Sequence, residues 1–206
     1  MKIYDISQEV FSCCVYPGDP SPERNRMLQI AKGDVCNLTG ITMCAHNGTH
    51  VDAPYHFVED GNTIDQVELK RFTGYAYVTF FDGEITAEAA HMIMEKARAA
   101  DVLCKDPANH ASNRILVGGK AVVTEEAAKV FVEEKIFLFG NESQTVGPED
   151  APMAVHKIML PAQIVLLEGI RLSGVAEGVY LLNAAPLNLG GADGAPCRAI
   201  LMKDFN

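Results

Sequence analysis

Apolar residues in this chain form short runs separated by turns, and two longer segments have a helical composition. The clearest run, residues 74–81, is aromatic and β-branched and ends at Asp82-Gly83, a pattern that predicts a strand closed by a turn. Similar runs predict further strands at 2–7, 38–45, 114–117, 136–139, 163–167, 179–182 and 197–202. Turn-forming residues at 16–20 interrupt this pattern near the N-terminus.

Residues 86–100 and 124–135 are rich in helix-forming residues and predict two helices. Each segment begins with a threonine, Thr86 or Thr124, that can cap the first turn, and the second has acidic residues where the helix dipole favours them. Strands and helices are mixed along the chain without a linker, a repeat or a low-complexity segment. We therefore expect one compact α/β domain over residues 1–206, with a mixed sheet and flanking helices.

The composition excludes several classes of protein. Of 206 residues, 48% are apolar and 21% are charged, as in an ordinary globular protein. The net charge of −10 and the lack of a Lys/Arg-rich run argue against nucleic acid and anionic membranes as partners, because phosphate binding needs clustered positive charge. No apolar stretch is long enough to cross a membrane, and the N-terminus lacks a hydrophobic signal core. Six scattered cysteines without a CxxC pair agree with a reducing compartment, so we expect a cytoplasmic protein.

Four ionisable side chains lie within eleven residues: His46, His50, Asp52 and His56. Nitrogen and oxygen ligands at this density are typical of zinc or manganese, whereas an all-oxygen set would indicate magnesium or calcium. In an extended segment, His46, His50 and Asp52 would lie on one face, with Gly48 leaving room for an ion. A helix is disfavoured here by the glycine, by β-branched neighbours and by a following proline.

A second candidate cluster consists of His156 and Glu168. Glu168 closes the apolar run at 163–167, and a buried carboxylate is costly unless it is paired or bound to a cation. From the residue pattern alone, His156 could equally be a helix-end or surface histidine, and Glu168 could pair with Arg171. The pattern therefore leaves the membership of both residues in a metal site open.

The string from His46 to Phe57, His-x-Gly-Thr-His-x-Asp-x-Pro-x-His-Phe, resembles the signature of the cyclase-like metal-dependent hydrolases. This family contains bacterial kynurenine formamidase and isatin hydrolase. The resemblance extends to the loop at 16–20, to the segments around the second cluster, and to the Gly-Ala-Asp-Gly-x-Pro-x-Arg-Ala stretch at 191–199. It implies an α/β fold of the swivelling β/β/α type, a homodimer or higher homo-oligomer, and a small-molecule substrate.

The resemblance also implies roles for the candidate ligands. His46 and His50 are implied as ligands of one metal, and Asp52 as a bridge to a second metal. His156 is implied as a ligand of the second metal, and Glu168 as a further bridge. We therefore expect a centre of two divalent cations, zinc or manganese.

By the same resemblance, His56 is expected to donate and accept the proton of the reaction, while the metals activate water as hydroxide. The implied reaction is hydrolysis of a small amide, as in the N-formylkynurenine formamidases of tryptophan catabolism. The alternative is a cyclase, a dehydratase, or a lactone- or isatin-type ring hydrolase that uses the same metals. Tyr16 stands where formamidases of this family typically carry a tryptophan. Tyr16 and Phe57 are candidates for stacking on an aromatic substrate, and simple packing explains them equally well.

Overall fold

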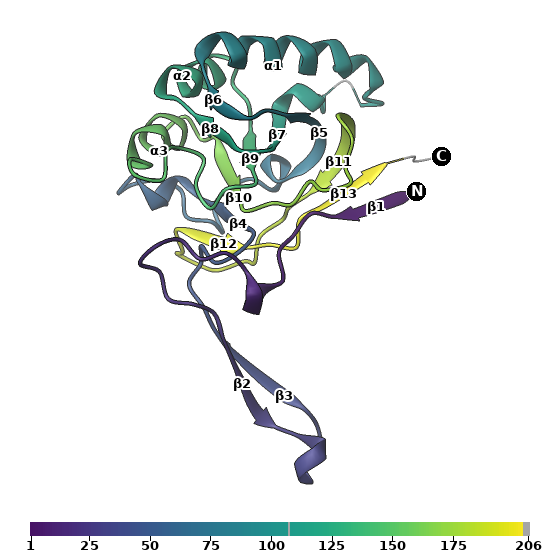
Figure 1. The fold of residues 1–206 in the computed structure, drawn as a ribbon, viewed down its shortest axis with the longest axis vertical. Helices are drawn as coiled ribbons and strands as arrows, with labels where there is room; N and C mark the ends of the chain where they lie inside the picture. The colour runs from purple at the N-terminus through teal and green to yellow at the C-terminus, as the bar shows by residue number, and fades with distance from the viewer. Residues whose placement is uncertain (107, 204–206) are drawn as a thin grey trace.

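A large curled sheet of mixed orientation organises the fold, and the helices pack on one of its faces (Figure 1). The computed structural model describes residues 1–106 and 108–203. Within these residues, nine strands form the main sheet in the order β1-β13-β11-β5-β7-β9-β10-β4-β12, and two small sheets pair β2 with β3 and β6 with β8. The strands are β1 (Lys2–Asp5), β2 (Glu23–Leu28), β3 (Leu38–Thr42), β4 (His50–Asp52), β5 (Thr73–Phe80), β6 (Gly83–Ile85), β7 (Arg114–Gly118), β8 (Ala121–Val123), β9 (Leu138–Asn141), β10 (Val165–Glu168), β11 (Gly178–Asn183), β12 (Gly194–Pro196) and β13 (Ile200–Lys203).

The centre of the main sheet is parallel, and both of its sides are antiparallel. Strands β5, β7, β9 and β10 run parallel to one another. Each consecutive pair is connected through a helix, namely α1 (Ala87–Ala100), α2 (Glu125–Glu133) or α3 (Met153–Met159). Parallel neighbours need such a crossover because a tight turn cannot join them. The predicted α/β class, a mixed sheet with flanking helices, is confirmed.

The two predicted helices begin where the sequence places their caps. The Thr86 hydroxyl accepts a hydrogen bond from the Ala89 amide at 3.3 Å, and the Thr124 hydroxyl accepts one from the Ala127 amide at 3.2 Å. Helix α3 is not apparent from the sequence, because its seven residues begin without a side-chain cap and are too few to display a helical period. Over residues 1–106 and 108–203, no helix has the length and apolar character needed to cross a membrane.

Strands β2 and β3 form an arm, residues 23–42, that projects away from the body of the molecule (Figure 1). The predicted strand at 38–45 is therefore shorter, Leu38–Thr42, and belongs to this arm instead of running into the histidine string. Its partner strand is not apparent from the sequence, because four of the six residues in Glu-Arg-Asn-Arg-Met-Leu are polar. Prediction from apolar runs fails here because both strands lie outside the core.

Pairing of β10 with β4 brings two segments that are distant in the sequence together. In this antiparallel register, Glu168 lies opposite His50, and Leu167 lies opposite Val51. Val51 and Leu167 are fully buried in one hydrophobic core. Because side chains alternate along a strand, His50, Asp52 and Glu168 point to the other face.

Candidate metal centre

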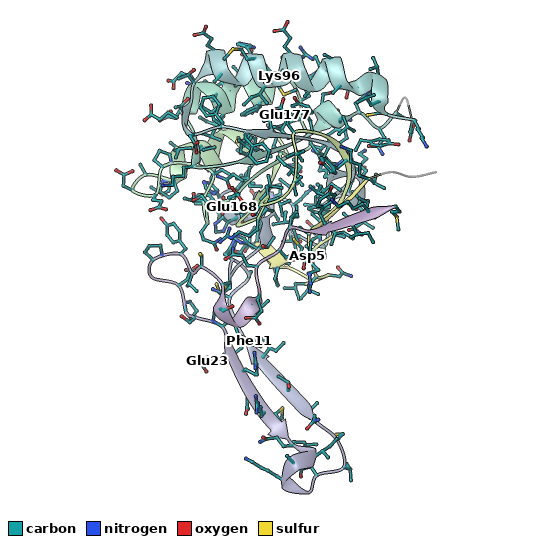
Figure 2. All side chains as sticks on the ribbon, turned by 45° about the vertical axis from the view of Figure 1, so that its right-hand side comes forward. Asp5, Phe11, Glu23, Lys96, Glu168 and Glu177 are labelled. Carbon is teal, nitrogen blue, oxygen red and sulfur yellow. The ribbon has the colours of Figure 1, made fainter. Side chains whose placement is uncertain are left out.

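Three polar side chains on the β4–β10 pair are almost fully buried. His50, Asp52 and Glu168 have exposed fractions of 1%, 1% and 2%. Figure 2 shows Glu168 inside the body, between the helical layer and the base of the arm. His156 on α3, 3% exposed, approaches two of these side chains, Asp52 and Glu168. The fold thus joins the histidine string to the second candidate cluster.

Each carboxylate turns one oxygen toward His50 and the other toward His156. His50 Nε2 lies 3.4 Å from Asp52 Oδ1 and 3.4 Å from Glu168 Oε2. His156 Nε2 lies 3.4 Å from Asp52 Oδ2 and 3.3 Å from Glu168 Oε1. These separations are longer than most N–H···O hydrogen bonds, about 2.7–3.2 Å. They match the spacing between neighbouring ligands of a tetrahedral ion, about 3.3–3.4 Å when the ligand bonds are roughly 2.0–2.1 Å.

Hydrogen bonds behind the histidines also fit bound cations. His50 Nδ1 donates to the Gly48 carbonyl at 3.0 Å, and His156 Nδ1 donates to the Pro152 carbonyl at 2.8 Å. These bonds fix each ring and leave its Nε2 available to an ion, an arrangement typical of metal-binding histidines. Asp52 Oδ2 is buried and has no hydrogen-bond partner among the described residues, a costly state that a cation would relieve. Imidazole nitrogen together with carboxylate oxygen suits zinc or manganese.

The carboxylates also control the protonation of the buried histidines. Burial lowers the pKa of His50 and of His156, but the attraction of the two nearby carboxylates for a protonated ring outweighs this effect and raises both pKa values to about 10. Burial raises the pKa of Asp52, whereas the three neighbouring histidines, His156, His46 and His50, hold it well below its usual value. A divalent cation at this site must therefore compete with protons for the imidazole nitrogens.

His46 reaches the centre from a turn rather than from a strand. The expected extended face is wrong for His46 and holds only for His50 and Asp52, because β4 begins at His50. Gly48 adopts a φ of +68° between them, a conformation that favours glycine. His46 Nδ1 lies 2.9 Å from Asp52 Oδ1. The structure thus brings together the five residues that the sequence suggested as ligands: His46, His50, Asp52, His156 and Glu168.

A cavity of about 260 Å³ opens beside this centre, and we call it the site cavity. His56 and Phe57 line it together with Tyr16. The short 3-10 turn Pro54–His56 follows β4, so the proline ends the strand register and directs His56 to the cavity. The Phe57 ring lies 4.6 Å from the His56 ring and 4.9 Å from the His156 ring. The expected proton-transfer residue and both expected substrate contacts therefore face one cavity.

Three residues near the site cavity receive no role from the sequence, although Asp19 and Asp193 lie in segments that resemble the family. Asp19 and Gln144 line the cavity. Asp193 Oδ2 lies 2.9 Å from His46 Nε2 and 3.0 Å from His56 Nδ1. Hydrogen bonds from both histidines hold the pKa of Asp193 well below its usual value. The one signal for Asp193 in the sequence is an acidic residue enclosed by small ones in the Gly-Ala-Asp-Gly stretch.

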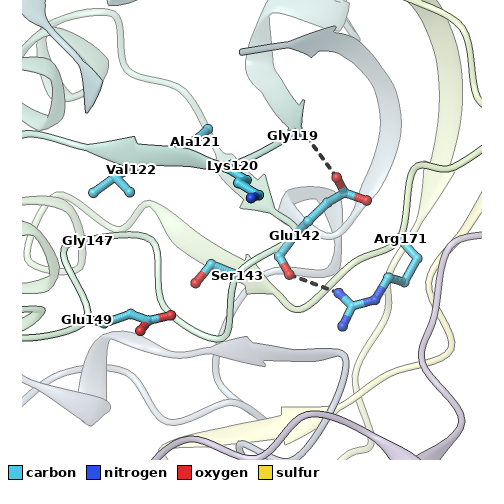
Figure 3. Close-up of a pocket in the computed structure, with 9 residues that line it drawn as sticks. All are labelled: Gly119, Lys120, Ala121, Val122, Glu142, Ser143, Gly147, Glu149 and Arg171. Carbon is cyan, nitrogen blue, oxygen red and sulfur yellow. Dashed lines mark hydrogen bonds between the residues drawn. The ribbon is translucent and has the colours of Figure 1, made fainter. Parts of the chain in front are cut away.

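A second cavity, of about 560 Å³, is lined by charged residues but lacks a metal-binding cluster among the residues described (Figure 3). Its Glu142 carboxylate accepts hydrogen bonds from the amides of Gly119 and Leu172, both at 2.8 Å. Arg171 donates to the Glu142 carbonyl at 2.9 Å rather than to Glu168, the partner that the sequence left open. These charged groups hold the backbone in place, whereas the cluster of histidines and carboxylates lies at the site cavity.

Known proteins share both the sequence and the fold of this chain. The family model described as "Putative cyclase" matches residues 4–148. Kynurenine formamidase from Erythrobacter litoralis is 31% identical over 205 residues, which cover 97% of this chain and 93% of that protein. A solved structure described as a predicted metal-dependent hydrolase from Bacillus stearothermophilus is 26% identical, with a TM-score of 0.77 over 97% of each chain. Isatin hydrolase A from Labrenzia aggregata, bound to benzyl benzoate, has the same fold, with a TM-score of 0.80, 20% identity, and coverage of 98% of this chain and 94% of that one. Matched over most of its length by the family model and by these relatives, the chain belongs to the cyclase family.

Proposed function

We propose that the chain is a metal-dependent amidohydrolase that cleaves the formyl C–N bond of an arylformamide such as N-formylkynurenine. The observation that carries this proposal is the arrangement of the Asp52 and Glu168 carboxylates. Each has one oxygen near His50 Nε2 and the other near His156 Nε2. Curated kynurenine formamidases that are 28% to 31% identical over nearly their whole length support the reaction class.

Two divalent ions, zinc or manganese, fit the arrangement of these side chains. We assign one ion to His46, His50 and Asp52. We assign the other to His156, with Asp52 and Glu168 shared between the two positions. When bound, such ions supply a Lewis acid for the carbonyl oxygen and lower the pKa of a water molecule. The buried carboxylates offset the positive charge that the ions bring into a low-dielectric interior.

His56 provides the proton step of the proposed reaction. An amide nitrogen is a poor leaving group until it is protonated, and an imidazole can both give and accept a proton near neutral pH. The His56 side chain lines the site cavity and is 27% exposed, so a substrate there can reach it. Tyr16 and Phe57 supply aromatic surface in the same cavity. Its volume of about 260 Å³ is below the roughly 300–1,000 Å³ of typical ligand pockets, which favours a substrate with a single ring.

The test combines metal analysis with turnover of defined substrates. Zinc-loaded protein is offered N-formylkynurenine, formanilide, isatin and a lactone, and we expect formate release from the first two. Chelation should remove both the metal and the activity. Activity that persists after residual metal is measured as absent would overturn the metal mechanism, and turnover of isatin or the lactone alone would reassign the chain to ring hydrolysis.

A pair of histidine variants tests the assigned proton step. His56→Ala should keep its metal and lose turnover by about 10²–10⁴-fold, the usual contribution of general acid–base catalysis. His91→Ala, a matched change on the exposed surface of α1, should leave metal content and turnover unchanged. An unimpaired rate for His56→Ala would end its assigned role.

We further propose that the active form is a homodimer in which each arm packs on the body of the other copy. An isolated two-stranded hairpin is at best marginally stable in water, yet this arm exposes apolar side chains: Val35 is 96% exposed and Ile41 is 60% exposed. An apolar groove of about 680 Å³, lined by Phe11, Ile41 and Leu187 among others, begins at the base of the arm. A twofold axis would let each copy cover the arm and the groove of the other.

Light scattering on size-exclusion fractions tests the dimer. Ile41→Glu should produce monomers, because it places a charge on the surface that is proposed to be covered. Thr42→Lys, at an exposed position on the opposite face of the same strand, should leave the mass unchanged. A monomeric wild-type protein at micromolar concentration would overturn the proposal.

A further inference from the structure

One carboxylate, that of Asp193, contacts two histidines with different expected roles. Its Oδ2 atom lies 2.9 Å from Nε2 of His46, an expected metal ligand, and 3.0 Å from Nδ1 of His56, the expected proton-transfer residue. The two imidazole rings lie side by side, with centroids 4.1 Å apart and planes tilted by 30°. The two nitrogens of the His46 ring therefore face different carboxylates, Nδ1 that of Asp52 and Nε2 that of Asp193.

The backbone holds this carboxylate at a fixed distance from β4. The Ala53 amide donates to the Asp193 carbonyl at 2.9 Å, and the next residue, Gly194, begins β12 and pairs with Asp52. A Cβ atom on Gly194 would lie 2.7 Å from a β4 carbonyl oxygen and 2.8 Å from the His46 ring, so only glycine permits this approach. The position of the Asp193 side chain therefore follows from the pairing of β12 with β4.

The chemistry of the contact determines which ring nitrogens carry hydrogen. An ionised carboxylate can only accept hydrogen bonds, so His46 must donate through Nε2 and His56 must donate through Nδ1. A neutral imidazole carries one N–H group, and the opposite nitrogen then presents a lone pair. For His46 that lone pair is on Nδ1, which would face a bound cation; without a cation, Nδ1 also carries hydrogen and donates to Asp52 Oδ1 at 2.9 Å. For His56 it is on Nε2, which is left for exchange of a proton with a substrate.

We propose that Asp193 is a positioning residue that fixes the tautomer of His46 and of His56 together, and thereby couples cation binding to proton transfer. This inference rests on the proposed function, because it assigns His56 the proton step. A surface ion pair is the simpler interpretation of a carboxylate that is 41% exposed. However, a single Asp193 oxygen receives both bonds, and the His46 side chain that it holds is only 17% exposed.

The first experiment compares variants of Asp193 with a matched control. Asp193→Asn keeps the shape of the side chain but loses its negative charge, and its amide can turn an NH2 group toward the rings, so it no longer forces both rings to donate. At saturating zinc, we expect its kcat on N-formylkynurenine to fall by about 100-fold or more and its KM to change by less than about 3-fold. The control, Asp65→Asn, alters an exposed carboxylate that accepts a bond from Gly191 in the same loop but touches no histidine. It should stay within about 2-fold of wild type.

Chemical rescue separates positioning from a general structural role. Asp193→Ala leaves space that is open to solvent, so added acetate should restore a measurable part of kcat for this variant and have no effect on wild type. A kcat of Asp193→Asn within about 3-fold of wild type at full zinc occupancy would overturn the proposal, and so would the lack of any acetate rescue of Asp193→Ala.

The second experiment measures the tautomers directly and does not depend on turnover. Long-range ¹H–¹⁵N spectra of the zinc-loaded protein, with His56 assigned from His56→Gln, should show hydrogen on Nδ1 of His56 in the wild-type protein. Asp193→Ala should shift His56 toward the Nε2–H tautomer. Hydrogen on Nε2 in the wild-type protein would overturn the positioning role. If no formamide is hydrolysed but the tautomers are as expected, the proposed function fails and the positioning role stands.

Discussion

Thr49 lies between the two histidines of the His-x-Gly-Thr-His string, and its side chain stabilises the fold through hydrogen bonds rather than facing the proposed metal. Its hydroxyl donates to the Gly169 carbonyl at 2.8 Å and accepts a hydrogen bond from the backbone amide of Gln8 at 2.9 Å. The residue is 4% exposed. Thr49 therefore ties the start of β4 to the end of β10 and to the N-terminal segment. Thr49→Val removes both bonds while keeping nearly the same shape.

The cost of Thr49→Val follows from the partners that remain. A typical intramolecular hydrogen bond contributes about 1 kcal/mol net, and an unpaired buried donor adds to the loss. The Gly169 carbonyl keeps a bond from the Gln8 side chain at 2.8 Å, so it is not left unpaired. Gln8 is half-buried, so in the variant water can partly replace the hydrogen bond that its backbone amide loses. We expect the free energy of unfolding to fall by about 2–3 kcal/mol and Tm to fall by roughly 4–12 °C.

Urea unfolding of the zinc-saturated protein, followed by circular dichroism, measures this loss. Thr49→Ser is the control, because it keeps the hydroxyl and removes one methyl group at a cost of about 1 kcal/mol. Both variants should retain bound zinc. If Thr49→Val lost less than about 1 kcal/mol, or no more than Thr49→Ser, the threonine would not hold the strand through its hydroxyl.

Three further predictions address the cations, the close approach of β12, and pH. Asp52→Asn should lose at least one zinc ion per chain by elemental analysis, because both oxygens of this carboxylate face imidazoles, and full zinc retention would contradict its bridging role. Gly194→Ala should lower the free energy of unfolding by about 1–3 kcal/mol, while Gly190→Ala, whose Cβ would meet nothing within 4 Å, should not. In metal-free protein, the pKa values of His50 and His156 are raised from 6.5 to about 10, so their stabilising contribution is complete below pH 6.5 and is lost as the pH rises through about 10. A urea midpoint that stays constant between these pH values would contradict this assignment.

Local patterns in the sequence predict the elements that lie in the core. Strand β5 and helices α1 and α2 have strong composition signals because burial selects their side chains, and their threonine caps give their starting points. Strand β2 gives no such signal, because its six residues lie outside the core and are mostly polar. Strand β12 has only three residues and is defined by its pairing with β4, which no local pattern can reveal.

The site likewise combines residues that a local sequence pattern reveals with residues that only long-range strand pairing brings together. The first candidate ligands are adjacent in the sequence, so their chemistry is visible without a structure, although the turn at His46 is not. Asp193 is separated from His46 by 147 residues, and only the pairing of β12 with β4 brings the two together. The sequence alone leaves Glu168 with a choice of partners. The structure resolves that choice because β10 places Glu168 opposite His50.

The proposed cation ligands and the proposed substrate contacts are attached to different parts of the fold. His50, Asp52 and Glu168 lie on paired strands of the main sheet, where the register fixes their spacing. Tyr16 and Asp19 line the site cavity from the loop that leads into the arm. Changes in this loop alter the shape of the cavity and leave the paired strands intact, as is common for binding loops on a rigid scaffold. We therefore expect that one proposed metal centre on this fold can serve different substrates, because the loop proposed to contact them is not part of the sheet that carries the proposed ligands.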